Sequence, residues 1–186
     1  MSVSSFASPT IYVARSDFLT HLAPSSYTES FDGLGNGPSG AQTFGTGPFA
    51  FTAFAPSDLY LAGGFLGTSQ INEALTVTFG AGVKAFGADF FTTDLNDAFQ
   101  SVLVTLSLSD GSTTSFTPTS LADSFRGFVS TVDISSFTIS GPGSSLYASL
   151  DNLTVGTAGN TVPEPGSLAL VGLAAAGLFA TRRRAA

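Results

Sequence analysis

Several short segments of the chain alternate apolar and polar residues, and this alternation restricts the folds that the chain can adopt. Leu75–Phe79 alternates without a break, and Val102–Leu108 does nearly the same. Successive side chains of a β-strand point to opposite sides, so this pattern predicts strands with one buried and one exposed face. Ser109–Ser112 contains an Asp-Gly pair, which predicts a hairpin turn into the next segment, Thr113–Phe116.

Similar segments, separated by Gly, Pro, Asp, Asn and Ser, continue through the body of the chain. There is no internal repeat and no alternation of strands with long helical patterns, which argues against a parallel α/β sheet. The 18 Phe residues, with no Trp, provide large side chains for a core between two sheets. We therefore predict an all-β, jelly-roll-like β-sandwich. The other predicted strands are Phe49–Phe54, Val83–Phe91, Phe128–Val129, Phe137–Ile139 and Leu146–Val155.

One short helix is predicted near the N-terminus, over Ser16–Leu22. Ser16 is a suitable N-cap, Asp17 is an early acidic residue, and Pro24 would end the helix. We expect this helix to pack on the outside of the sandwich or to close one end of it. The predicted organisation is an N-terminal segment with the helix (1–26), the β-sandwich domain (27–156), a linker (157–162) and a C-terminal segment (163–186).

Charge is scarce in this chain and unevenly placed. Charged residues make up 10% of it, against roughly 25% in an average soluble domain. Twelve of the 13 acidic residues precede Val162, whereas three of the six basic residues are Arg182–Arg184. A body this acidic argues against nucleic acid as a partner, and suits either divalent cations or simple solubility. The absence of Cys excludes disulfides, thiol catalysis and zinc–thiolate sites.

The C-terminal segment combines a Pro-Glu-Pro tripeptide, an uncharged stretch and three arginines. Residues 165–181 would span about 25 Å as a helix, close to the ~30 Å of a hydrocarbon core. A buried helix of the sandwich is the alternative, but this stretch is apolar on all sides. We predict a single transmembrane helix, with Arg182, Arg183 and Arg184 keeping the C-terminus in the cytoplasm. The residues predicted to lie in the membrane include Gly166, Leu168, Leu170, Val171, Leu173, Leu178 and Phe179.

Pro163, Glu164 and Pro165, followed by this apolar stretch and the arginines, resemble the PEP-CTERM sorting signal of exopolysaccharide-producing Gram-negative bacteria. The resemblance covers Val162–Arg184 and includes all three parts in order. It implies export, transient insertion in the inner membrane, and cleavage near the motif by an exosortase, a membrane cysteine protease. The body would then pass to the cell envelope, the surface or the extracellular matrix. The two prolines would keep the motif extended outside the bilayer. Glu164 supplies a single charge there that a membrane protease could recognise.

The N-terminus does not match this destination. Met1–Phe18 has no basic n-region at its start and no continuous apolar core, so it does not look like a secretory signal peptide. Since a sorting signal has no purpose without export, we expect a start site upstream of Met1.

Two segments of the body resemble the first and last strands of jelly-roll domains that occur in PEP-CTERM proteins and carbohydrate-binding modules. They are Tyr27–Gly33 and Leu146–Val155. The resemblance implies a structural calcium ion held by Asp32 and Asp151, with Glu29 a weaker candidate and carbonyl oxygens completing the shell. The alternative is that Asp151 caps backbone amides at a strand end.

The apolar phase of the last strand slips in the middle. Leu146, Ala148 and Leu150 are even-numbered, whereas Leu153 and Val155 are odd-numbered. A strand keeps one parity on one face, so the slip at Asp151-Asn152 predicts a β-bulge that turns a side chain in a new direction.

No catalytic motif stands out. The single histidine, His21, lies in the predicted helix with no nucleophile beside it, which indicates a packing or surface role. Gly33–Gly37 precedes no helical pattern, which argues against a dinucleotide-binding loop. Asp89, Asp94 and Asp97 could serve glycoside hydrolysis, but acids among Thr and Asn more often form turns or bind ions.

We therefore expect a non-enzymatic, exported protein with a structural or adhesive sandwich at the cell surface or in the polymer matrix. Its expected partners are the exosortase, the inner membrane and the exopolysaccharide, and calcium is the only cofactor considered. The alternative is a carbohydrate-binding module, and a glycoside-acting enzyme is a third class. With no Trp and four Tyr, rings on which sugars could stack are scarce, which favours the structural role. An aromatic groove would favour sugar binding instead.

Overall fold

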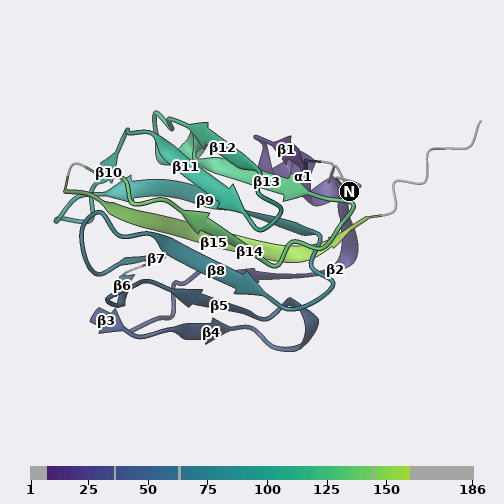
Figure 1. Cartoon of the computed structure of the whole chain (residues 1–186), viewed down its shortest axis with the longest axis horizontal. Coiled ribbons are helices and arrows are strands. Elements are labelled where there is room, and N and C mark those ends of the chain that lie inside the picture. Colours follow the sequence, from purple (N-terminus) through teal and green to yellow (C-terminus); the bar gives the residue numbers. More distant parts are fainter. Residues whose placement is uncertain (1–7, 36, 63, 144, 160–186) are drawn as a thin grey trace, which may run out of the picture.

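A computed structural model describes residues 8–159 apart from residues 36, 63 and 144, and it consists of two antiparallel β-sheets packed face to face (Figure 1). The first sheet has nine strands in the order β1-β13-β9-β15-β7-β6-β3, with β10 paired to β9 and β2 paired to β15. They are β1 (Thr10–Tyr12), β2 (Leu22–Glu29), β3 (Gly37–Ser39), β6 (Leu59–Ala62), β7 (Phe65–Thr68), β9 (Ala85–Thr93), β10 (Phe99–Gln100), β13 (Phe125–Val129) and β15 (Tyr147–Ala158).

The second sheet has six strands in the order β12-β11-β14-β8-β5-β4. They are β4 (Gln42–Phe44), β5 (Phe51–Phe54), β8 (Leu75–Phe79), β11 (Val104–Leu108), β12 (Thr113–Phe116) and β14 (Ser136–Ile139). From β7 to β15 the chain passes several times from one sheet to the other, so the sandwich is closed by connections that cross between the layers. The prediction of a β-sandwich body is confirmed, and the jelly-roll connectivity stays a prediction.

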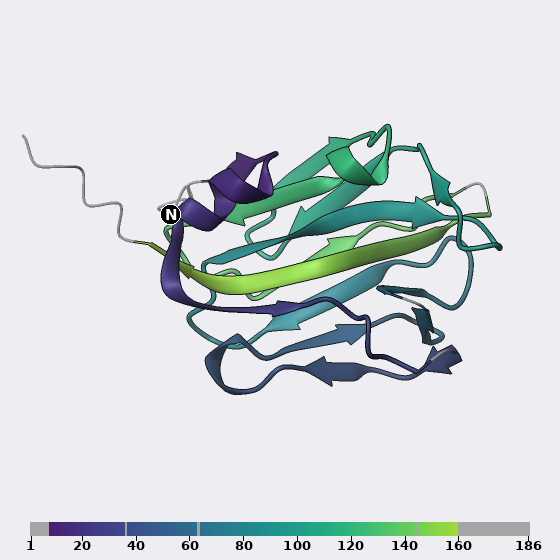
Figure 2. The same ribbon diagram turned by 180° about the vertical axis from the view of Figure 1, so that it is seen from behind.

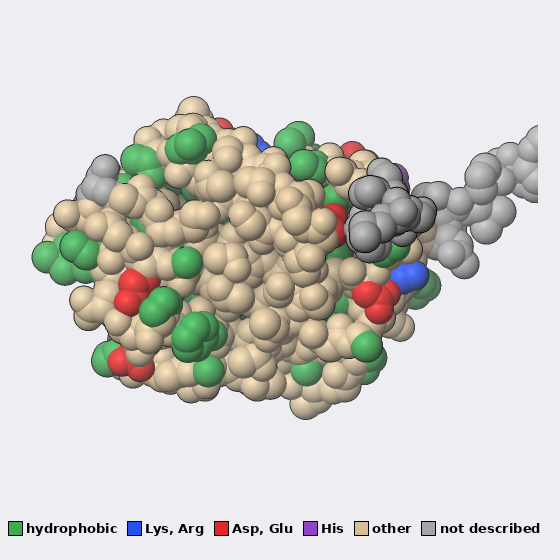
Figure 3. Space-filling view, in the orientation of Figure 1, with side chains coloured by type: hydrophobic (Ala, Val, Ile, Leu, Met, Phe, Trp, Pro, Cys, Tyr) green, Lys and Arg blue, Asp and Glu red, His purple; other side chains and the backbone are tan. Residues whose placement is uncertain are grey.

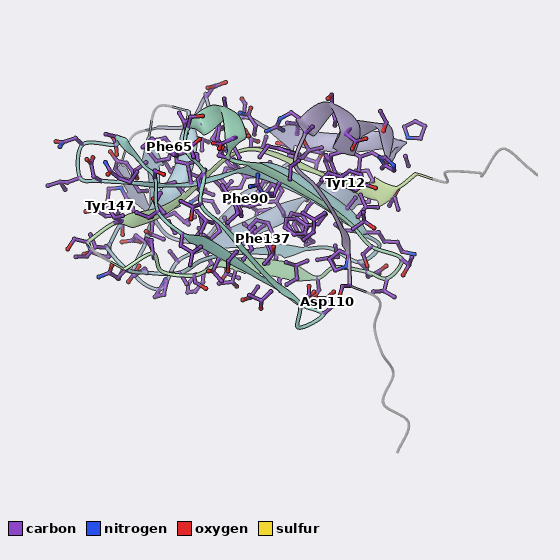
Figure 4. All side chains as sticks on the ribbon, turned by 90° about the horizontal axis from the view of Figure 1, so that it is seen from above. Tyr12, Phe65, Phe90, Asp110, Phe137 and Tyr147 are labelled. Atoms are coloured by element: carbon purple, nitrogen blue, oxygen red, sulfur yellow. The ribbon has the colours of Figure 1, made fainter. Side chains whose placement is uncertain are left out.

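Aromatic side chains fill the space between the sheets. The Phe86 ring of β9 stacks on Phe137 of β14, with ring centroids 4.6 Å apart, and on Phe128 of β13 at 4.8 Å. Phe90 meets Phe137 edge-on at 5.5 Å. In Figure 4, Phe90 and Phe137 lie between the layers, whereas Phe65 and Asp110 lie on opposite outer sides. Burial of these rings, with the aromatic contacts between them, holds one sheet against the other.

The helix prediction is confirmed in kind and wrong in its bounds. Helix α1 covers Arg15–Thr20, and its N-cap is Ala14, without a side-chain cap. Ser16 therefore lies inside the helix. Pro24 does not end it, because the chain has already entered β2 at Leu22. In this edge strand Pro24 is exposed, which is where a residue without a backbone N–H is tolerated.

The N-terminal elements belong to the nine-stranded sheet and cover part of its outer face (Figure 2). Phe18 of α1 is fully buried and packs with Ala85 and Phe125. This approach requires glycine in the sheet below, because a Cβ on Gly127 would lie 2.5 Å from the Phe18 ring. The 3-10 helix η2 (Leu121–Asp123) lies on the same side of the sheet, beyond the end of α1.

Candidate functional site

The bulge predicted at Asp151-Asn152 is present in β15. The pairing of β15 with β9 shifts register between Asp151 and Thr154, and Asn152 adopts a left-handed backbone with φ of 51°. Leu150 before the bulge and Leu153 after it are both fully buried in the core. The extra residue therefore keeps both apolar segments facing inward while Asp151 and Asn152 lie on the outer face.

A polar cluster forms around this bulge on the outer face of the nine-stranded sheet. Asp151 is the cross-strand partner of Asp89 on β9. Arg15 of α1 donates from Nη2 to Asp89 Oδ2 at 2.8 Å and from Nη1 to the Asn152 carbonyl at 3.0 Å. The Asn152 amide donates to Asp89 Oδ2 at 3.1 Å and to Asp151 Oδ2 at 2.7 Å. The bulge and Arg15 together hold the helix on the sheet.

Asp151 is the carboxyl group that its surroundings perturb most in this cluster. Burial raises its pKa to about 6, and the negative charges of Asp89 and Asp32 act in the same direction. The hydrogen bond from the Asn152 backbone N–H and the charge of Arg15 oppose the shift. A proton or another positive charge near Asp151 would therefore be favourable.

The predicted calcium ligands, Asp32 and Asp151, lie close enough for the charge of one to influence the other. Both Asp151 oxygens accept hydrogen bonds from Asn152, and Glu29 is engaged by the Phe31 N–H and the Tyr27 hydroxyl. Within the described ranges no group of three or more His, Asp or Glu side chains could hold a metal ion. Calcium prefers six to eight oxygen ligands, so main-chain carbonyls would have to supply most of them. Calcium binding here stays a prediction.

Next to the polar cluster, two adjoining cavities of about 180 and 470 Å³ form what we call the aromatic groove. They adjoin because Phe65 and Asp97 line both of them. Strands β7, β9 and β15 provide the floor, and β6, η2 and the turn between β9 and β10 provide the walls. The smaller cavity, the tyrosine pocket, is lined by Tyr60, Phe65, Gly67, Thr68, Ser69, Thr93, Asp94, Leu95, Asp97, Tyr147 and Ser149. The larger cavity is lined by Gly64, Phe65, Asp89, Phe91, Asp97, Phe99, Leu121, Ala122, Asp151 and Asn152.

The tyrosine pocket presents aromatic surface above a floor of hydroxyl groups. The Tyr60 and Phe65 ring centroids are 6.4 Å apart, and both side chains are half-buried. Two buried hydroxyls, on Thr93 and Ser149, lie 3.2 Å apart beneath them. A Cβ on Gly67 would lie only 3.2 Å from the Ser149 hydroxyl, so the absence of a side chain there keeps the floor open. Aromatic walls with a few fixed polar groups are typical of small-ligand sites.

The outer face of the six-stranded sheet differs from the groove. Most of its outward positions carry hydroxyl side chains, with Phe54 an exposed exception, and the central part of this face is free of charged side chains (Figure 3). The cross-strand hydroxyl pairs on this face include Thr43–Thr52 at 2.9 Å, Thr76–Thr138 at 3.0 Å and Thr105–Ser115 at 2.9 Å. We call it the hydroxyl face.

Comparison with known proteins adds the C-terminal signal to this picture. Residues 161–184 match the profile of the PEP-CTERM protein-sorting motif. The chain carries a PEP-CTERM sorting signal. The signal implies that the protein is exported and processed by an exosortase, so its β-rich body takes part in a membrane-associated sorting step. No curated protein and no solved structure matches the chain.

The residues predicted for sorting lie outside the described part of the chain. This holds for Pro163, Glu164 and Pro165, for the predicted membrane helix and for Arg182–Arg184. Among the described residues, no helix is both long and apolar enough to cross a membrane.

Other residues considered from the sequence have local roles in the structure. His21 packs against Tyr12 with the rings tilted and their centroids 4.5 Å apart, and its Nδ1 lies 3.0 Å from the Asp17 carbonyl oxygen. Asp94 orders the turn before β10 by accepting hydrogen bonds from the backbone N–H groups of Asn96 and Ala98.

Sequence reasoning did not identify the tyrosine pocket. A usable signal was present, because Tyr60 follows Leu59 and Phe65 precedes Leu66, and both leucines are fully buried. The aromatic residues therefore occupy the outward parity of their strands. Large rings at solvent-facing positions of neighbouring strands indicate a binding surface.

Proposed function

We propose that the body of this exported protein binds a polysaccharide in the aromatic groove. The observation that carries the proposal is that Tyr60, Phe65 and Tyr147, which come from three strands, line one pocket together with hydroxyl and carboxylate groups. Sugar rings present apolar C–H faces and polar edges. A pocket that combines aromatic walls with Thr, Ser and Asp side chains suits both kinds of surface.

The sorting signal supports a location of this binding activity outside the cytoplasm. We propose that the body is transiently tethered to the inner membrane, with the C-terminal arginines inside, and then released to the envelope, the surface or the matrix. A polysaccharide secreted by the same cell is the ligand that such a protein would meet. The role in the matrix would then be adhesive, because one end of the sandwich holds the polymer.

A purely structural role is the second candidate, and the hydroxyl face favours it. Uncharged Ser and Thr side chains in paired rows make a well-ordered surface that needs no specific ligand. The two roles differ in where a ligand binds. A glycan held by the groove supports the adhesive role, and a body that binds no glycan supports the structural one.

We propose binding without catalysis. Asp89 and Asp151 are neighbours on one sheet, and both carboxylates accept hydrogen bonds from Arg15 or Asn152. Titration of the full-length chain in mild detergent with neutral oligosaccharides, such as cellohexaose and mannohexaose, tests this proposal. Saturable binding that is lost in the Tyr147→Ala variant is the expected result. If none of the glycans binds, the proposal of polysaccharide binding is contradicted. Release of new reducing ends would indicate a hydrolase.

Processing is tested separately by mass spectrometry of the protein purified from its native envelope. We expect the C-terminus to end close to Pro163-Glu164-Pro165. An intact terminus that includes Arg182–Arg184 would contradict exosortase cleavage.

Calcium at Asp32 and Asp151 has its own test. If calcium binds there, EDTA lowers the melting temperature of the wild-type chain and leaves that of Asp151→Ala unchanged. A wild-type melting temperature that EDTA does not change would contradict calcium binding.

A further inference from the structure

The charges lining the aromatic groove are all of one sign. Its two cavities are lined by the carboxylates of Asp89, Asp94, Asp97 and Asp151, and no Lys, Arg or His is among the described lining residues. The nearest cation, Arg15, is already bound to Asp89 at 2.8 Å. A uronate, sulfate or phosphate group entering the groove would meet like charge without a compensating cation. The groove therefore disfavours acidic polymers.

Asp97 is the carboxylate most available to a ligand in the tyrosine pocket. Asp94 is occupied, because its two oxygens accept hydrogen bonds from two backbone N–H groups and from Gln100 Nε2. Asp97 is exposed at the boundary of the two cavities and accepts a single bond, from the Tyr60 hydroxyl at 3.2 Å. An ammonium group could bind Asp97 without breaking an internal contact of the turn.

The aromatic side chains around Asp97 add to the attraction for a cation. Tyr60, Phe65 and Tyr147 all line the pocket to which Asp97 contributes, and their ring faces carry negative potential. Figure 4 shows Phe65 and Tyr147 at the same end of the molecule, far from Tyr12. A carboxylate beside several rings is a suitable site for an alkylammonium group, because ion pairing and cation–π attraction act together.

The volumes of the cavities indicate how a polymer would lie. The tyrosine pocket, at about 180 Å³, is smaller than the roughly 300–1,000 Å³ of sites for drug-sized ligands. It therefore suits one sugar residue. The adjoining cavity, at about 470 Å³, can take the next part of the chain. The selective contact would then be made by one residue of the polymer.

From these features we infer that the groove selects a polysaccharide with free amino groups, and that the ammonium of one hexosamine residue binds Asp97 between Tyr60, Phe65 and Tyr147. The inference rests on the proposed function and specifies its ligand class. It differs from simple attraction by the acidic body, because it assigns the selectivity to one side chain.

Three oligosaccharides with the same β-1,4 backbone test the inference: cellohexaose, N-acetylated chitohexaose and the fully deacetylated glucosamine hexaose. They differ at the second carbon, which carries a hydroxyl, an acetamide or an amine. Calorimetric titration of the full-length chain at about pH 6 should show the amine form binding about tenfold more tightly than the other two. A lysine hexapeptide controls for attraction by charge alone and should bind more weakly.

The Asp97→Asn variant should reduce that preference to about twofold or less, because an amide cannot form an ion pair with the ammonium group. Asp110→Asn, in the hairpin of the opposite sheet, is the matched control and should leave the preference unchanged. Equal binding of all three oligosaccharides, or a preference that survives in Asp97→Asn, would overturn the inference and leave the proposed function intact. A lysine peptide that binds as tightly as the glucosamine hexaose would also overturn it. Absence of binding to every oligosaccharide would refute the proposed function itself.

Discussion

The two outer faces of the sandwich come from the same alternating pattern but differ in chemistry. On the six-stranded sheet, the outward positions carry Ser and Thr, whose hydroxyls are satisfied by one another across the strands. On the nine-stranded sheet, the outward positions around the groove carry aromatic and acidic side chains, and η2 and the turn between β9 and β10 add walls beside them. On the hydroxyl face, the paired side chains hydrogen-bond to one another. The groove face leaves side chains such as Asp97 available to a ligand.

The difference shows where irregular structure is used. The hydroxyl face is built from regular strand pairs. The groove face contains a bulge at Asn152 and a second left-handed residue at Asp97, in the turn before β10. Residues other than glycine adopt positive φ at a cost, and such positions concentrate at functional sites. Asp97 and Asn152 line the groove to which we assign binding, whereas the other left-handed residues, Phe31, Asn72 and Ser145, do not.

The largest effect is expected in the core that both faces share. Phe137→Ala removes a fully buried ring that stacks on Phe86, and we expect a loss of about 3–5 kcal/mol in the free energy of unfolding. Phe54→Ala on the hydroxyl face is the matched control, because that ring is 49% exposed, and it should cost much less. Urea denaturation measures both. Equal losses would mean that the two sheets are not held together as described.

Removing aromatic surface from the groove should separate the two faces in a binding assay. The double variant Phe65→Ala/Tyr147→Ala should weaken oligosaccharide binding by about 2 kcal/mol or more, since aromatic anchors carry most of the energy of an interface. The double variant Thr76→Val/Thr138→Val, on the hydroxyl face, should bind as the wild type does. Weaker binding in the Thr76→Val/Thr138→Val variant would mean that the ligand binds the hydroxyl face and would contradict binding in the groove.

The pH dependence of stability should differ between the wild type and Asp151→Asn. Burial raises the pKa of Asp151 to about 6, so the folded state binds the proton more tightly than the unfolded chain does. The resulting stabilisation is present below about pH 4 and is lost as the pH rises through about 6. We expect the wild type to lose about 1 kcal/mol relative to Asp151→Asn over this range, allowing for screening at a partly exposed site. Urea denaturation at a series of pH values measures this difference. If the free energies of unfolding of the wild type and Asp151→Asn change in parallel with pH, the raised pKa of Asp151 is contradicted.

The smallest effect is expected for the hydroxyl pairs. Replacing both Thr76 and Thr138 by Val removes the 3.0 Å hydroxyl contact but keeps the branched shape that strands favour. The free energy of unfolding should change by about 0.5 kcal/mol or less. Thermal melting checks this, and a loss several times larger would show that the hydroxyl face is a cooperative network.

The sequence predicted those features that depend on local alternation. Leu75–Phe79 is a strand with the predicted bounds because its period-two pattern is complete. Thr113–Phe116 is also a strand with the predicted bounds, because the Asp-Gly turn before it indicates where the second strand of the hairpin begins. The bulge at Asp151-Asn152 could be predicted equally well from the sequence, since a change in the parity of the apolar residues within one strand requires an extra residue. The helix bounds were wrong because the cap of α1 is a backbone feature at Ala14, which residue type does not indicate.

The groove could not be predicted in the same way, because it depends on pairing between distant segments. Tyr60 and Tyr147 meet only after β7 pairs with both β6 and β15. Arg15 bonds to Asp89 only after α1 has packed on the sheet through Phe18. The composition indicated that rings for sugar stacking are scarce, and the sheet brings two of the four Tyr residues, Tyr60 and Tyr147, to one pocket with Phe65.

Hydrogen–deuterium exchange of the full-length chain, with and without a bound oligosaccharide, tests most directly which face binds. If the ligand binds in the groove, exchange should slow in Phe65–Thr68, in the turn of residues 94–98 and at the start of β15, with β8 and β14 unchanged. Slower exchange confined to β8 and β14, or no change in the groove at saturating ligand, would contradict the assignment of binding to the aromatic groove.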